Sequence, residues 1–228
     1  MEAFADPGRH MPSRTQPVAL TVLLLAGACS SRSDDPAVVY PTDTSQAAYS
    51  QLPDSFDFVT AAVRQMGEPP LVGARLRPGT TVIRFVWARS FHPYVAVRFV
   101  MEPKQCAVMT TEMNLDETLW GPPDSTGMME ATGTKAGQII RQDSVPLLAG
   151  DCKAMRSTLE RLGLWQVTSR QIGGLDGSVW RFERLDANGY TFVQRWSPNA
   201  QDGHELWSAG LALLKLAHAL PSGPRTLY

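Results

Sequence analysis

Two stretches of alternating apolar and polar side chains constrain the fold of this chain most strongly. Residues 81–89 place aromatic and aliphatic side chains on one side and Arg84 on the other, and residues 94–102 repeat the pattern with Arg98. Only residues 90–93 separate the two stretches, a length typical of the turn between paired strands. The pattern therefore predicts an antiparallel β-hairpin.

The rest of the chain adds strands and helices to this hairpin. Strands are predicted at 106–113, 138–147, 178–186 and 190–196, and a long loop with room for a short element around Trp120 is predicted at 114–137. Apolar residues at helical spacing predict helices at 54–66, 151–162 and 203–220. Asp151 is the expected N-cap of the second helix, and Asp202 with Glu205 resembles a capping box before the third. We therefore expect one α+β domain over residues 54–220, in which helices pack on an antiparallel sheet of about five or six strands, followed by a tail at 221–228.

The last two strands carry the clearest turn signal. Ala187-Asn188-Gly189 is a three-residue loop that ends in glycine, which favours a hairpin pairing Asp186 with Tyr190. In that register one strand face carries four aromatic residues, Trp180, Phe182, Phe192 and Trp196. This face is expected to form core beneath the helices at 151–162 and 203–220.

The N-terminus has the layout of an export signal. An apolar run at 18–28 follows Arg14, ends in small residues, and stands directly before Cys29. The run is too short to span a bilayer, which takes about 20 apolar residues. We interpret residues 1–28 as a signal peptide, with either Met1 or Met11 as the start. Residues 29–53 are polar and contain prolines, so they are interpreted as a flexible tether.

Leu25-Ala26-Gly27-Ala28-Cys29 resembles the bacterial lipobox, although Ala26 occupies the place where leucine is usual. The resemblance implies that the Cys29 thiol is lipidated and anchors an exported protein in the cell envelope. In a Gram-negative host, Ser30 after the cysteine favours the outer membrane, facing the periplasm. The alternative is an ordinary secretory signal that is cleaved near an incidental cysteine.

Composition narrows the choice of partners. The formal net charge is −1, with 21 basic and 22 acidic residues, which does not favour nucleic acid as a partner. Besides Cys29 the chain has only Cys106 and Cys152, which form a disulfide or remain two buried thiols. Neither cysteine has a histidine pair at ligand spacing, so no metal site and no cofactor is predicted.

Candidate catalytic residues are few and weakly specified. Glu183 and Asp176 are candidates for the carboxylate pair of a glycan hydrolase, near aromatic residues that suit a sugar. The simpler interpretation makes Glu183 an ion-paired residue of the sheet, on the same strand face as Arg181 and near Arg195. His92, with Ser90 and either Asp176 or Asp143, is a weaker hydrolase candidate, because no nucleophile-elbow motif surrounds a serine.

Three segments together resemble a group of uncharacterised bacterial exported proteins and lipoproteins. They are Arg89-Ser90-Phe91-His92-Pro93, Gly174-Leu175-Asp176-Gly177 followed by Trp180 and Glu183, and Tyr190 with Arg195-Trp196-Ser197-Pro198. The group has no assigned activity, so the resemblance implies no catalytic role. It does imply one polar cluster of Arg89, His92, Asp176, Glu183 and Arg195, and the alternative is a buried network that only stabilises the fold.

The leading functional hypothesis is a non-enzymatic envelope lipoprotein: a small domain on a lipid-anchored tether that binds an envelope protein or glycan. The second hypothesis is an envelope hydrolase that acts on glycan through Glu183 and Asp176. The third is a purely structural or assembly role.

Overall fold

A computed structural model of the chain describes residues 37–40, 57–120, 122, 128–169 and 176–220. Compactness divides the chain into two units, Met1–Asp34 and Asp35–Tyr228, and all described residues belong to the second. The predicted signal peptide, Cys29 and the tail at 221–228 lie outside the described residues.

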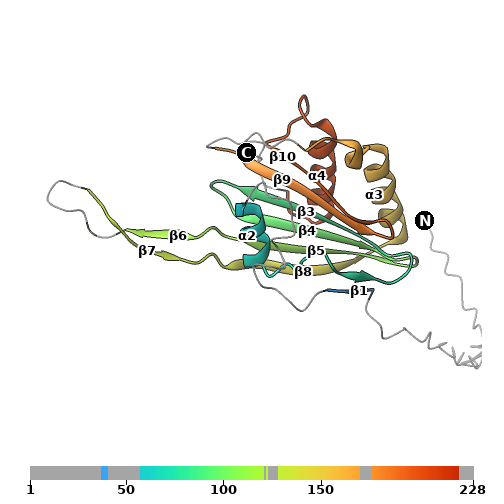
Figure 1. Ribbon diagram of the computed structural model, residues 1–228, viewed down its shortest axis with the longest axis horizontal. Coiled ribbons are helices and arrows are strands. Elements are labelled where there is room, and N and C mark those ends of the chain that lie inside the picture. Colours follow the sequence, from blue (N-terminus) through green and yellow to red (C-terminus); the bar gives the residue numbers. More distant parts are fainter. Residues whose placement is uncertain (1–36, 41–56, 121, 123–127, 170–175, 221–228) are drawn as a thin grey trace, which may run out of the picture. The chain divides into compact units, whose positions relative to one another are not determined.

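The described unit is an α+β domain built on a six-stranded sheet, which confirms the predicted fold class (Figure 1). The strand order is β10-β9-β3-β4-β5-β8, and every neighbouring pair is antiparallel. The strands are β3 (Thr81–Arg89), β4 (Tyr94–Met101), β5 (Cys106–Met113), β8 (Ile139–Leu147), β9 (Ser178–Asp186) and β10 (Gly189–Trp196). The central hairpin predicted from the alternating stretches is the β3–β4 pair.

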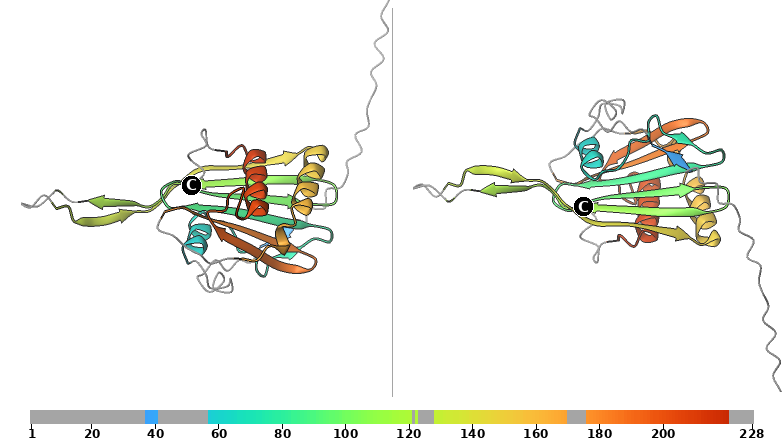
Figure 2. Two further views of the ribbon diagram at one scale, coloured as in Figure 1. Left: turned by 90° about the horizontal axis from the view of Figure 1, so that it is seen from above. Right: turned by 90° about the horizontal axis from the view of Figure 1, so that it is seen from below.

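Different elements cover the two faces of the sheet (Figure 2). The helices α3 (Ala149–Arg161) and α4 (His204–Leu216), with the short helix η1 (Leu164–Gln166), pack on what we call the helix face. The helix α2 (Asp57–Gln65) and the small sheet of β1 (Val38–Val39) and β2 (Arg75–Leu76) lie on the opposite face, which we call the α2 face. None of the described helices is long and apolar enough to cross a lipid bilayer.

Alternation along a strand assigns each side chain to one of these faces. Phe85, Trp87, Phe99 and Trp180 point to the helix face and are completely buried in its apolar core. Their neighbours in the same strands point to the α2 face, where two smaller apolar clusters surround α2 and Leu71. The central strands are therefore buried on both sides.

The segment 114–137, predicted as a loop, instead forms the hairpin β6 (Glu117–Trp120) and β7 (Ala131–Lys135). This hairpin continues the pair of β5 and β8 beyond the sheet (Figure 1). Each of its strands has only four or five residues. Such short stretches show too few alternations to reveal a strand in the sequence.

The predicted register of the last hairpin is wrong by one residue. Gly189, rather than Tyr190, pairs with Asp186, so only Ala187 and Asn188 form the loop. A one-residue shift moves every side chain of β10 to the other face. Phe192 and Trp196 therefore lie half-buried on the α2 face. Trp180 and Phe182 are core beneath the helices, as predicted.

Helix ends and the tether also differ from expectation. The N-cap of α3 is Leu148 and not Asp151, which lies within the first turn. The N-cap of α4 is Gly203 with φ 84°, without a side-chain cap, because Asp202 instead accepts a hydrogen bond from Arg195. Val38–Val39, within the predicted tether, pairs with β2 and so belongs to the folded unit.

Candidate functional site

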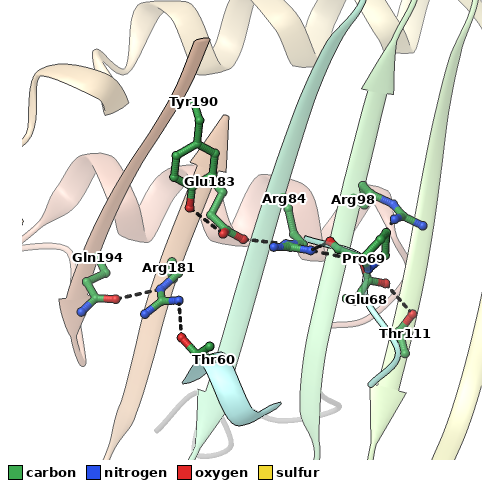
Figure 3. Close-up of polar contacts among 10 residues, drawn as sticks. All are labelled: Thr60, Glu68, Pro69, Arg84, Arg98, Thr111, Arg181, Glu183, Tyr190 and Gln194. Atoms are coloured by element: carbon green, nitrogen blue, oxygen red, sulfur yellow. Dashed lines mark hydrogen bonds and ion pairs between the residues drawn. The ribbon is translucent and has the colours of Figure 1, made fainter. Parts of the chain in front are cut away.

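A row of charged side chains crosses the buried α2 face of the sheet (Figure 3). Strand pairing sets Glu183 of β9 beside Arg84 of β3, and Arg84 beside Arg98 of β4. Glu68, on the segment that follows α2, covers this row from above the sheet. We call Glu68, Arg84, Arg98 and Glu183, with Arg181 and Tyr190 beside them, the buried charge network.

Arg84 and Glu183 form the centre of the network. Both side chains are 0% exposed, and Arg84 Nε donates to Glu183 Oε2 at 2.6 Å. The second carboxylate oxygen, Oε1, accepts a hydrogen bond from the Tyr190 hydroxyl at 2.7 Å. Arg84 Nη1 donates to the carbonyl oxygen of Pro69 at 2.6 Å. Both oxygens of the carboxylate are thus occupied.

Glu68 extends the network toward β4 and β5. Its Oε2 atom lies 3.8 Å from Arg84 Nη1 and 3.5 Å from Arg98 Nη1. Its Oε1 atom accepts a hydrogen bond from the Thr111 hydroxyl at 2.9 Å. The guanidinium of Arg98 in turn lies 5.0 Å from the ring centre of Tyr40, a cation–π distance. One carboxylate therefore faces two guanidinium groups, those of the fully buried Arg84 and the partly buried Arg98.

Arg181 borders the network on the side of β10. Its Nε atom donates to the Gln194 side-chain oxygen at 2.9 Å, and its Nη1 atom lies 3.3 Å from the Thr60 hydroxyl of α2. Burial lowers the pKa of Arg181 more than the nearby Glu183 raises it. These contacts join β9 to β10 and to α2.

The electrostatics of the centre keep Glu183 ionised. Burial alone raises the pKa of its carboxyl, but the charge and hydrogen bond of Arg84, with Arg181 and Tyr190, lower it below the usual 4.5. The pKa of the Tyr190 hydroxyl is raised, first by burial and then by the adjacent carboxylate. Glu183 is thus a buried anion that accepts hydrogen bonds, and Tyr190 remains a neutral donor.

This arrangement is unsuited to acid–base catalysis. A glycosidase acid needs a raised pKa and access to the leaving oxygen. Glu183 has a lowered pKa and no exposed surface. The network instead has the features of a structural ion-pair cluster, as the simpler interpretation of Glu183 proposed.

The predicted carboxylate pair is not formed. Asp176 is exposed and precedes β9, whereas Glu183 is buried within it. At about 3.3 Å per residue, the five strand steps from Ser178 to Glu183 alone span roughly 16 Å, and Asp176 lies beyond the start of the strand. Glycosidase carboxylates lie only about 5–9.5 Å apart.

The residues of the predicted polar cluster are also dispersed. Arg195 pairs with Trp180 and so points to the helix face, where its Nη1 atom donates to Asp202 at 2.8 Å. Arg89 is on that face too, donating to the Pro93 carbonyl and stacking 4.0 Å from the Trp87 ring centre. Glu183 faces the other way. The predicted cluster is not formed, because side chains alternate between the two faces of a strand and Glu183 lies on the opposite face from Arg89 and Arg195.

The structure brings the serine–histidine candidates only partly together, because Ser90 lies beside Gly177, the residue after Asp176, while Asp143 is on another strand. The Ser90 hydroxyl donates to the Gly177 carbonyl at 3.0 Å, and His92 lies half-buried in the turn between β3 and β4. Asp143 is on the edge strand β8, where Arg141 holds its carboxylate at 2.7 Å. Two strands, β4 and β5, lie between β3 and β8.

Of the two alternatives for Cys106 and Cys152, the structure has the disulfide. Cys106, at the start of β5, and Cys152, in the first turn of α3, form a disulfide with their Cα atoms 5.8 Å apart. The bond ties α3 to the sheet at one end of the helix-face core.

One apolar groove lies on the same side of the molecule. It measures about 500 Å³ and lies between α3 and α4 beside β8, with Val145, Leu148, Met155, Ala212 and Leu216 among its lining residues. Among the described residues, no three histidine, cysteine, aspartate or glutamate side chains are placed to hold a metal ion.

Comparisons of this chain with family models, curated proteins and solved structures found no match. Membership of the group of exported proteins that the sequence resembles therefore stays a prediction.

Sequence reasoning missed the partner of Glu183. Arg84 stands between Val82 and Val86, which are themselves buried on the α2 face. An arginine flanked by apolar residues on its own strand face was the available signal that this face is covered. Its pairing with Glu183, 99 residues away, could not be found from local pattern.

Proposed function

We propose that this chain is an exported envelope lipoprotein, anchored through Cys29, whose folded domain is a non-enzymatic binding or structural module. The apolar run before Cys29 supports export, and the lipobox-like ending supports lipidation. Residues from 35 onward would then form the domain that the anchor holds at a membrane surface.

The Cys106–Cys152 disulfide is the structural observation that carries the export part of the proposal. Disulfides persist in oxidising compartments and are rare in the bacterial cytosol. The two cysteines belong to different elements, 46 residues apart in sequence, yet their Cα separation lies within the range a disulfide allows. Such a bond suits a protein that folds after export.

The buried charge network supports the non-enzymatic part. Its carboxylate centre is enclosed, ionised and saturated with hydrogen bonds. The other carboxylate that sequence reasoning favoured, Asp176, is exposed and far from it. Among the described residues, the surfaces open for binding include the β6–β7 hairpin, the apolar groove and the edge strand β8.

The anchor is tested by mass spectrometry of the mature protein from membranes of a bacterial host. The expected N-terminus is a lipid-modified Cys29. Cys29→Ser should leave the chain unprocessed or release it from the membrane, whereas the neighbouring Ser30→Ala should not. An unmodified N-terminus at another residue would refute lipidation.

The module is tested by enzyme assay. The full chain should release no more reducing sugar from envelope glycan than its Asp176→Asn variant does. Turnover by the wild type that this substitution abolishes, without a change in melting temperature, would restore the hydrolase hypothesis.

A further inference from the structure

The strand β8 forms an open edge of the sheet. It is the last strand in the order, and the described residues include no strand on its outer side. Most of its nine residues are exposed, among them Ile140 at 56% and Val145 at 44%. A long edge strand with exposed apolar residues is a template for pairing with another chain.

Pro146 shows which backbone groups of β8 face outward. Proline lacks an N–H, so within a sheet it takes positions whose N–H points away from the neighbouring strand. By alternation, Gln142 and Ser144 then direct their N–H and C=O groups to the open edge, whereas Arg141 and Asp143 direct theirs to β5. The free edge is therefore centred on Gln142.

The side chains around Gln142 are self-complementary in charge. Arg141 and Asp143 flank it, and both pair with β5 residues on the helix face. If a second copy of β8 runs antiparallel with Gln142 opposite Gln142, each Arg141 comes opposite Asp143 of the second copy. Opposite charges in such cross-strand pairs are stabilising, and like charges are destabilising.

Other registers are less favourable. A dyad at Asp143 sets Asp143 opposite its own copy, and a dyad at Arg141 opposes two arginines. A one-residue shift would set an outward backbone position against an inward one and oppose side chains from different faces. Among the registers centred on residues 141–143, the charge pattern thus favours the one with Gln142 on the axis.

We propose that this chain forms a two-fold symmetric dimer in which β8 pairs antiparallel with β8 of a second copy, with Gln142 on the symmetry axis. The contact is isologous, the commonest form of homodimer interface. It joins two six-stranded sheets into one and shields the exposed Ile140 and Val145. The proposal does not depend on lipidation of Cys29.

Cysteine cross-linking tests the register directly, with the full chain purified in detergent and treated with a mild oxidant. Paired residues that exchange both hydrogen bonds have Cα atoms about 5.5 Å apart, within disulfide range. Gln142→Cys is therefore expected to give cross-linked dimers on a non-reducing gel. Ser144→Cys is the matched control, because four residues of offset separate its two copies by roughly 13 Å.

The wild-type chain controls for cross-linking through Cys29. Absence of dimers with Gln142→Cys, or equal cross-linking at position 144, would overturn the proposal. Stronger cross-linking of Asp143→Cys would overturn this register.

Charge reversal gives an independent test by sedimentation. Asp143→Arg and Arg141→Asp each create like charges across the dyad, so each variant alone should self-associate about tenfold more weakly than the wild type. An equimolar mixture of the two should dimerise again, because every pair is then opposite. Arg141 also donates to the Ala217 and His218 carbonyls at the end of α4, so melting temperatures are recorded for both variants. A monomeric wild type, or a mixture no better than the single variants, would contradict the proposal.

Discussion

The two faces of the sheet are stabilised in different ways. The helix face is an apolar core in which aromatic rings of β3 and β9 pack against α3 and α4. The α2 face has apolar clusters too, but the buried charge network runs between them. Neighbouring residues of one strand, Phe182 and Glu183, are both 0% exposed and face these two environments.

The difference shows what each face contributes. Apolar burial stabilises the helix face roughly in proportion to area, and it tolerates many apolar sequences. A buried ion pair contributes little net stability, since desolvation opposes the attraction, but removing one partner is strongly destabilising. We infer that the network specifies the register of β9 on β3, because a one-residue slip would move Glu183 into the aromatic core.

Truncation of the central tryptophan should have the largest effect. Trp180 lies 5.2–5.6 Å, between ring centres, from Phe85, Trp87 and Trp207. Trp180→Ala should lower the free energy of unfolding by about 5 kcal/mol, the upper end of the range for buried aromatic residues. Chemical denaturation measures this loss. Trp196→Ala, half-buried on the α2 face, should lose clearly less, and equal losses would contradict the difference between the faces.

Breaking the central ion pair should be nearly as severe. Arg84→Met leaves Glu183 buried without its countercharge, and we expect a loss of about 3–4 kcal/mol. Adding Glu183→Leu should recover part of this loss, since the two partners of the ion pair are then removed together, while Arg181 and the Tyr190 hydroxyl lose the carboxylate beside them. Denaturation of both single variants and the double variant gives the coupling energy.

The matched control for this cycle is an ion pair near the surface. Arg77 and Glu102 lie 3.1 Å apart with side chains 32% and 16% exposed. Arg77→Met should change the free energy of unfolding by no more than about 1 kcal/mol. If the double variant with Arg84→Met and Glu183→Leu is as unstable as Arg84→Met alone, the loss does not come from the unpaired charge of Glu183.

Removal of the disulfide should have an intermediate effect on the helix face. The two cysteines are 46 residues apart in sequence, so replacing both by serine removes the cross-link that restricts this segment in the unfolded chain. The expected loss is about 2–4 kcal/mol. Thermal melts of oxidised wild type, reduced wild type and the double variant check this value, and identical melts would show that the bond contributes nothing.

The smallest effect is the pH dependence of the network. The pKa of Glu183 is lowered in the folded protein, so its stabilisation is complete above its ordinary value of 4.5 and declines as the pH falls through the lower folded value. The difference in unfolding free energy between wild type and Glu183→Gln should be constant above pH 4.5 and shrink below it. A wild type that instead gains stability relative to Glu183→Gln as the pH falls from 7 to 5 would mean a raised pKa, as a catalytic acid requires.

Local patterns predicted most of the secondary structure of this domain. The bounds predicted for β3, β5 and β9 agree with the structure, because alternation over eight or nine residues is a strong local signal. The same rule failed for β6 and β7, whose strands are too short to alternate visibly. Cap positions failed as well, since Asp202 bonds with Arg195 rather than with the start of α4.

The candidate site was only partly predictable. The sequence marked Glu183 as an ion-paired residue and Cys106 and Cys152 as disulfide partners. It did not show that Arg84 is the partner of Glu183, because that contact depends on which strands are neighbours.

The sequence by itself determined the six strands of the main sheet, the helices α2, α3 and α4, and the alternation that makes each long strand two-faced, because these depend on neighbours within a few residues. Only the tertiary structure decided which face of β10 turns toward α2. The one-residue difference in the loop at Ala187 and Asn188 decided whether Phe192 and Trp196 join the core. That choice is cooperative: Val193 packs beneath the helices and Gln194 bonds with Arg181 only in the observed register.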